Sequence, residues 1–260
     1  MTGEASSDDV HKLRTSVRRI EVRLGHCSPR VAKSLRALRK KAGKVRDIDV
    51  HLGLLKSSLF TPATKSAAIA SSVRDELRRI LNSNRERDQK SLLRLVARAA
   101  PLLESWLPKA VHRAIRPEPD AAAARQLTIS ARRHYLQWTH SIPDAGAPLH
   151  RLRIDAKKLR YSLEPLAAFP DAAETAEHLK QVQDAIGSWH DWATLLELAG
   201  NKLSSASSEP VFAALEARTT REFNKAHRTA ERVRQWMIVT KSPASPTRGH
   251  SSPYLVRKAG

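Results

Sequence analysis

Cysteine, glycine, aromatic residues and long apolar runs are all scarce in this chain of 260 residues, which has one cysteine, 9 glycines and 5% aromatic residues. A single cysteine, Cys27, excludes an intramolecular disulfide, so the chain needs no oxidising compartment. No stretch approaches the roughly 20 apolar residues of a membrane span. The first ten residues, MTGEASSDDV, lack the charged start and apolar run of a secretory signal. These absences predict a cytoplasmic protein without membrane insertion.

Acidic residues are also too few to balance the bases. Lysine and arginine number 46 against 26 acids, which gives a formal net charge of +20. A compact chain with this charge repels itself unless an anion neutralises it, so the composition predicts a polyanionic partner. Nucleic acid, an anionic membrane surface and polymeric phosphate all remain open at this point.

The apolar residues recur at spacings of three and four, and runs of alternating β-branched residues are missing, so we predict an all-α protein. Cap signals at Ser6 to Asp9 and at Ser28-Pro29 mark the first two helices. The predicted helices cover about 9–25, 28–57, 62–98 (with a break at 82–84), 120–140, 147–168, 171–200 and 209–239. Pro101, Pro108, Pro117 and Pro119 predict a broken connection after the third helix.

Two segments have the composition of connections rather than helices. Residues 141–146, rich in turn-forming types, predict a linker between a first half at about 8–140 and a second half at about 147–240. Residues 241–260 contain three of the 14 prolines and many serines without a helical period, which predicts a disordered basic tail.

The sequence contains an internal repeat that corresponds to a predicted helical hairpin. VHKLRTSVRR aligns with LHRLRIDAKK at an offset of 139 residues, which pairs His11 with His150. LRALRKKAGKVRDIDV aligns with LKQVQDAIGSWHDWAT at an offset of 144, which pairs Gly43 with Gly187. Two pairs of segments at nearly equal offsets indicate a duplication and predict two similar antiparallel helical-bundle halves.

Each copy carries an apolar stripe and a separate basic stripe. At about 100° per residue, the predicted core stripes are Val10, Leu13, Val17, Ile20 and Leu24 in one copy and Leu149, Leu152, Ala156, Leu159 and Leu163 in the other. About 120° away, each first helix carries His, Arg and further bases at matching positions. Solvated helix faces usually mix acids and bases, so two copies of a base-rich stripe favour a phosphate-binding surface over a merely wet face.

Several residues keep two interpretations. The histidines fit structural roles as well as ligand binding, and Gly43 and Gly187 predict either close packing or ligand approach inside a helix. Asp47 and Asp191 could orient arginines or bind a metal. A further basic row on the last helix fits a solvated face and a ligand surface equally: Arg218, Arg221, Lys225, Arg228 and Arg232.

In combination, these four motifs resemble the CHAD domain, the conserved histidine α-helical domain, over about residues 8–240. The resemblance implies two helical-bundle halves around a basic central groove or pore that binds inorganic polyphosphate, with recruitment to polyphosphate granules. It implies no cofactor, metal or catalytic residue, and no CYTH domain, to which some relatives are fused, is visible. Other polyanions and granule-associated proteins are further candidate partners.

Carried onto the matching positions, the resemblance predicts a polyphosphate site made of His11, Arg14, Arg18, Arg19, Arg36, Arg39, Arg46, His150, Arg153, Lys157, Lys158, Arg160, Tyr161, Lys180 and His190. Two positions depart from the repeat. Gln183 replaces the base at Arg39, and His190 replaces Arg46, so the second hairpin is expected to hold phosphate less firmly.

Other functions find less support in the sequence. No Gly-rich phosphate loop, HExxH motif or GxSxG motif is present, so we expect no enzymatic activity. Clustered arginines and lysines disfavour a divalent cation. Nonspecific nucleic-acid binding is the main alternative, although Trp138, Trp189 and Trp236 fit core positions better than base-stacking ones. A protein that merely coats an acidic surface is a third possibility.

Overall fold

The structure is a computed structural model that describes residues 5–23, 28–60, 67–114, 120–140, 146–203 and 209–240. These residues are almost entirely helical, and no strand occurs among them. The predicted all-α class is therefore confirmed. The elements are α1 (Ser7–Arg23), α2 (Pro29–Leu54), η1 (Ser58–Phe60), α3 (Ala67–Ala114), α4 (Ala121–Trp138), α5 (Gly146–Leu163), η2 (Glu164–Leu166), α6 (Pro170–Lys202) and α7 (Glu209–Val239).

Local signals in the sequence fix several helix starts. Ser6 and Asp9 bond reciprocally at the start of α1: the Asp9 amide donates to Ser6 Oγ at 3.1 Å, and the Ser6 amide donates to Asp9 Oδ2 at 3.0 Å. Ser28 Oγ accepts from the Val31 amide at 3.4 Å, and Pro29 begins α2. Asp120 caps α4 in the same way. These caps agree with the predicted starts of the first, second and fourth helices.

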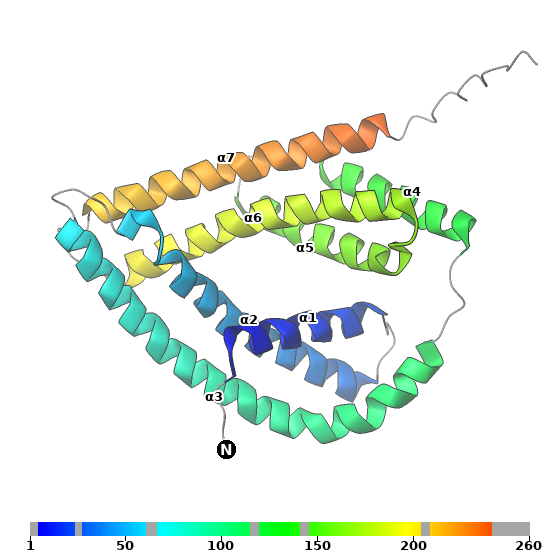
Figure 1. Cartoon of the computed structure of the whole chain (residues 1–260), viewed down its shortest axis with the longest axis horizontal. Helices are drawn as coiled ribbons and strands as arrows, with labels where there is room; N and C mark the ends of the chain where they lie inside the picture. Colours follow the sequence, from blue (N-terminus) through cyan, green and yellow to red (C-terminus); the bar gives the residue numbers. More distant parts are fainter. Residues whose placement is uncertain are drawn as a thin grey trace, which may run out of the picture.

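Helices α1 and α2 form one hairpin, and α5 and α6 form another (Figure 1). The first hairpin packs on α3, while the second packs between α4 and α7. The two hairpins meet through α1 against α5 and α2 against α6. In Figure 1, α3 runs as a long arc around the α1–α2 hairpin, and α7 lies beside α6 along the opposite edge.

Three apolar clusters form the core. One lies among α1, α2 and α3, and a second lies among α4, α5, α6 and α7. The third joins the ends of α2, α3, α6 and α7 around Phe60 and Trp192. The two predicted apolar stripes are confirmed, since Val10, Val17 and Leu149 are buried and their stripe neighbours are buried or packed against the clusters. Leu24 lies outside the described residues.

The predicted end of the third helix is wrong. Helix α3 continues without a break through residues 82–84 and through Pro101 and Pro108 to Ala114. A proline removes one helical hydrogen bond and bends the helix. Here the residues between the two prolines, including Leu102 and Trp106, pack against the first cluster. That packing offsets the lost hydrogen bonds, and α3 bends around the hairpin instead of ending (Figure 1).

Other sequence predictions have mixed outcomes. Trp189 and Trp236 pack against the core, as expected, but the core assignment of Trp138 is wrong because this residue, the last of α4, is 40% exposed. Helix α5 ends at Leu163 rather than near 168, and a short 3-10 turn follows. The predicted linker core at 141–145, Cys27, Pro117, Pro119 and the predicted disordered tail at 241–260 all lie outside the described residues.

Candidate functional site

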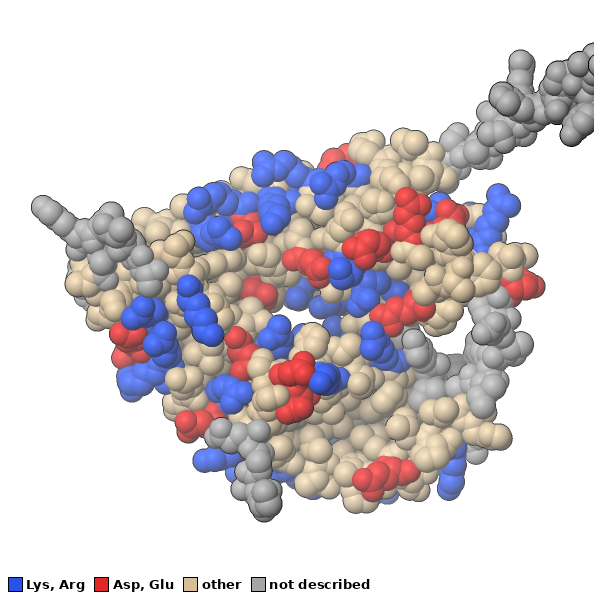
Figure 2. Space-filling view, viewed as in Figure 1, with Lys and Arg blue, Asp and Glu red and all other residues tan. Residues whose placement is uncertain are grey.

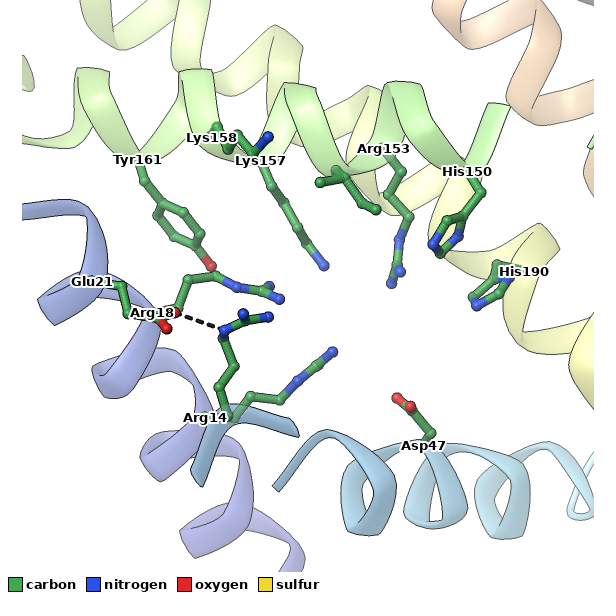
Figure 3. A pocket seen from close by; sticks show the side chains of 12 residues that line it. Arg14, Arg18, Glu21, Asp47, His150, Arg153, Lys157, Lys158, Tyr161 and His190 are labelled. Carbon is green, nitrogen blue, oxygen red and sulfur yellow. Dashed lines mark ion pairs between the residues drawn. The ribbon is translucent and has the colours of Figure 1, made fainter. Parts of the chain in front are cut away.

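A polar pocket of about 430 Å³ lies where the two hairpins meet. Four helices line it with Arg14, Arg18 and Glu21 from α1, Arg39 and Asp47 from α2, His150, Arg153, Ile154, Lys157, Lys158 and Tyr161 from α5, and His190 from α6. The surface is hollowed near the centre of the molecule, where Lys and Arg side chains gather (Figure 2). Figure 3 shows Arg14 and Arg18 pointing from α1 towards Arg153 and Lys157 of α5.

Helical spacing explains why these side chains share one pocket. Arg14 and Arg18 are four residues apart on α1, and Arg153 and Lys157 are four apart on α5, so each pair projects from one face. The apolar stripes of the same helices are buried in separate clusters. Burial of the apolar faces therefore turns the two basic faces towards each other.

Nine of the fifteen predicted site residues line this pocket: Arg14, Arg18, Arg39, His150, Arg153, Lys157, Lys158, Tyr161 and His190. The other six do not. His11 and Arg36 are exposed, and Lys180 is exposed beside Glu177 and Asp184. These residues lie on the predicted face of each helix but at the wrong point along its length. The helices cross at one point, so only part of each basic stripe reaches the pocket.

Ion pairs hold two of the remaining residues away from the pocket. Arg19 contacts Glu164 at 3.2 Å across the two hairpins, and Arg160 contacts the same carboxylate at 2.9 Å. Arg160 also donates to Gln183 at 3.2 Å and stacks over Tyr161. Arg46, the sixth, is half-buried on α2 outside the lining. These three arginines therefore lie outside the pocket lining.

Three lining residues escaped the prediction: Glu21, Asp47 and Ile154. Glu21 pairs with Arg39 at 2.7 Å (Figure 3) and lies three residues beyond Arg18 on the same stripe, so the stripe itself contained the signal. For Asp47, the sequence predicts a role in orienting arginines or in binding a metal, but not a place in the pocket lining. Ile154 carries no sequence signal for a polar site.

Four cations of the pocket form no ion pair, although the charges of Asp47 and Asp191 act on Arg14 and Lys157 from a greater distance. Arg14, Arg18, Arg153 and Lys157 form no ion pair within the described part of the chain. Nε of Arg14 and Nε of Arg153 are buried and have no hydrogen-bond partner among the described residues. We call these four residues the central cations. Buried, unpaired donors of this kind are costly and call for an acceptor from outside the chain.

Burial and mutual repulsion disturb the protonation of the central cations. Burial, together with the neighbouring charges of Arg153, Arg18 and Arg14, lowers the pKa of Lys157 to about 6. Burial also lowers the pKa of Arg14. Without an anion, the pocket therefore disfavours the protonated form of Lys157. A bound anion would favour that protonated form again.

Two histidines from different helices meet at one end of the pocket. The rings of His150 and His190 lie 4.4 Å apart. Burial lowers the pKa of His190 to about 4, and burial also lowers the pKa of His150. Both rings are therefore neutral near pH 7, when each carries one N–H donor and one acceptor. Nδ1 of His150 is buried without a hydrogen-bond partner among the described residues.

Arg153 separates this pocket from a smaller one of about 300 Å³ with a different charge. The smaller pocket is lined by Leu54, Arg153, Gln183, Asp184, Gly187, Ser188 and Asp191. Burial raises the pKa of Asp191, and the nearby Asp47 carboxylate acts in the same direction. The smaller pocket thus contains the carboxylates of Asp184 and Asp191, whereas the larger pocket contains mainly cations.

The two helix-interior glycines give space to two of the central cations. A Cβ at Gly43 would lie 3.7 Å from Nε of Arg14, and a Cβ at Gly187 would lie 3.3 Å from an Nη of Arg153. In each hairpin, the glycine of the second helix faces an arginine of the first. Close packing against the site, one of the two interpretations of these glycines, therefore holds for both.

We expect Gly43→Ala to raise the free energy of unfolding by up to about 1 kcal/mol, because alanine is the better helix former and 3.7 Å is an ordinary contact. Gly187→Ala should gain less, since the new Cβ must displace the Arg153 guanidinium by a few tenths of an ångström. Thermal unfolding of both variants measures the difference. Equal gains in both would show that Arg153 is not tightly placed.

Among the described residues, no group of three or more His, Cys, Asp and Glu side chains is placed to hold a metal ion. None of the described helices combines the length and apolar character needed to cross a membrane.

The CHAD domain family model matches residues 2–200, which is most of the chain. The chain belongs to the CHAD domain family. Two solved structures share its fold. PptA from Streptomyces chartreusis is 16% identical, with a TM-score of 0.59 and 90% coverage of each chain. The CHAD domain from the plant Ricinus communis is 22% identical, with a TM-score of 0.52, and the match covers 92% of this chain and 78% of the plant chain. No curated protein sequence matches the chain.

Proposed function

We propose that this CHAD domain protein binds inorganic polyphosphate, without catalysis, in the pocket between its two hairpins. We further propose that the hairpins are copies of each other, that the pocket is their shared basic groove, and that binding recruits the protein to polyphosphate granules in the cytoplasm. The paired contacts of Gly43 with Arg14 and of Gly187 with Arg153 support the duplication.

The single observation that carries the proposal is the set of four unpaired central cations facing one another. Like charges held together in a partly buried pocket destabilise the empty protein. An anion that contacts several of them at once removes this cost and satisfies the buried donors of Arg14 and Arg153. The pocket therefore favours a ligand with several adjacent negative charges.

The spacing of the cations favours a chain of phosphates over one isolated ion. Four residues of helix correspond to about 6 Å along the axis, which separates Arg14 from Arg18 and Arg153 from Lys157. Arginine binds phosphate oxygens in pairs, and lysine supplies a point charge. Cations spaced in this way, on two helices, would contact successive groups of an extended polyanion.

Glu21 and Asp47, the two lining carboxylates, do not change this preference. Glu21 is paired with Arg39, which leaves an excess of positive charge in the pocket. Asp47 lies near the histidines (Figure 3), so it biases that end against a phosphate. Polyphosphate should therefore lie closest to the arginines of α1 and α5.

Nucleic acid is the alternative that the net charge of +20 leaves open. A competition assay separates the two. Labelled long-chain polyphosphate is bound to the protein and displaced with unlabelled polyphosphate, DNA or RNA at matched phosphate concentration, with fluorescence anisotropy as the readout. We expect polyphosphate to compete at least tenfold better, with an affinity that falls steeply with salt. Equal competition by DNA would contradict the proposal.

A further inference from the structure

Helix α7 carries an exposed row of four bases: Arg221, Lys225, Arg228 and Arg232, here called the α7 row. None of the four lines either pocket. Lys and Arg side chains gather over the middle of α7, away from the central hollow (Figure 2). The row is therefore separate from the pocket.

We propose that the α7 row binds a second polyphosphate chain, so that one molecule bridges two chains. This inference rests on the proposed function, because the pocket must hold the first chain. The sequence fits a solvated face and a ligand surface equally, and this proposal makes the row a ligand surface.

The row differs in its ion pairs from the neighbouring bases of α7. None of its four members forms an ion pair with another described residue, whereas the bases on either side do. Arg218 contacts Glu222 at 2.8 Å, and Arg234 contacts Glu231 at 3.1 Å. Glu222 is buried and also accepts from Ser188 at 3.0 Å. The acids next to the row are thus already engaged.

The spacing of the bases in the row causes mutual repulsion that destabilises α7. Arg221 and Lys225 are four residues apart, as are Arg228 and Arg232, and like charges at this spacing destabilise a helix. The rest of the molecule is also strongly basic. An external polyanion along the row relieves this repulsion over about 16 Å of helix.

A row of four bases on α3 carries the same charge as the α7 row. Arg87, Lys90, Arg94 and Arg98 are exposed and repeat at similar intervals. Two of its members are engaged in hydrogen bonds, since Arg87 donates to Asn84 at 2.9 Å, and Arg98 donates to the Arg94 carbonyl at 3.4 Å. Asp88, which pairs with Lys41, also lies within this stretch. The α3 row therefore serves as a control of equal charge.

The surroundings of the α7 row favour polyphosphate over nucleic acid. The aromatic residues of α7 are Phe212, Phe223 and Trp236, and all three pack against apolar clusters, so none is free to stack on a base. A second chain of the same polymer is thus the occupant that the surface and the pocket favour together.

The test is a bridging assay with polyphosphate chains too short to reach from the pocket to the row. One set of chains is immobilised on beads, and a second set is free and labelled. We expect the unchanged protein to bind the beads and to retain labelled chains on them. The variant with glutamine at Arg221, Lys225, Arg228 and Arg232 should bind the beads as before but retain at least tenfold less label. The matched variant with glutamine at Arg87, Lys90, Arg94 and Arg98 should behave like the unchanged protein.

Each contrary outcome overturns a defined statement. Full bridging by the α7 variant, including bridging through self-association, would exclude the row as the second site. Equal losses in the α7 and α3 variants would show a diffuse polycation. Labelled DNA of equal phosphate number retained as well as polyphosphate would overturn the choice of ligand. Failure of the unchanged protein to bind the beads would instead contradict the proposed function of the pocket.

Discussion

Replacing the four central cations, Arg14, Arg18, Arg153 and Lys157, with glutamine is expected to weaken polyphosphate binding by on the order of a thousandfold. A hydrogen bond to a charged group contributes about 1.5 to 3 kcal/mol, and four such cations act on one ligand. A thousandfold loss corresponds to about 4 kcal/mol, which is below the simple sum because neighbouring contacts are not additive. Titration of long-chain polyphosphate at two salt concentrations measures the loss.

The same variant should remain folded and become more stable. Glutamine keeps most of the length of each side chain and removes the repulsion among the cations in the pocket. We therefore expect an unchanged circular dichroism spectrum and a higher midpoint of thermal unfolding. The gain in stability with a loss of binding distinguishes a binding site from a structural network, whose loss would lower the midpoint.

The α3 variant with glutamine at Arg87, Lys90, Arg94 and Arg98 is the control for net charge. It also removes four positive charges, but from an exposed face of α3 outside the pocket. We expect its affinity to fall by less than about tenfold, because exposed charges are screened and contribute mainly through the overall field. A loss equal to that of the central-cation variant would mean that the pocket is not a defined site.

Local sequence signals predicted most of the fold because helix formation depends on local patterns. The apolar stripes of α1 and α5 and the caps at Ser6 and Ser28 are readable from single segments. Helix α3 was not readable in this way. Pro101 and Pro108 are helix breakers locally, and only packing of their neighbours against the α1–α2 hairpin keeps α3 continuous.

The site was predictable by helix face but not by position along the helix. The helical projection correctly places Arg14 and Arg18 on one face of α1. It also places His11 on that face, although His11 lies about one turn before the point where α1 meets α5. The crossing point depends on tertiary packing. The same holds for the ion pair of Arg19 with Glu164, which joins residues 145 apart in sequence and draws that arginine away from the pocket.

Polyphosphate affinity is expected to fall as pH rises, by up to about tenfold per pH unit between pH 6.5 and 8.5. The cause is Lys157, whose pKa in the empty pocket is lowered to about 6 by burial and by the charges of Arg153, Arg18 and Arg14. A bound phosphate favours the charged amine and raises this pKa. Between the two pKa values, binding must therefore take up one proton, and each pH unit in that window costs up to 1.36 kcal/mol.

The stability of the empty protein should change with pH in the opposite direction. The pKa of Lys157 is lower in the folded protein than in the unfolded chain, where it takes its ordinary value of 10.5. The unfolded chain thus holds more protons between these values, so the contribution of Lys157 to the free energy of unfolding rises with pH. His150 and His190, whose pKa values are lowered below the ordinary histidine value, contribute little above pH 7.

Lys157→Arg is the matched variant for this prediction, because it keeps the positive charge but does not lose its proton in the working range. Titrations of short-chain polyphosphate at several pH values, in buffers with different heats of ionisation, measure both affinity and proton uptake. The unchanged protein should take up close to one proton at pH 8, and the arginine variant should take up much less. The ionisation of polyphosphate itself is common to both proteins and cancels in the comparison. Equal proton uptake by the two proteins would exclude Lys157 as the titrating group and place the pH dependence in the ligand or at another residue.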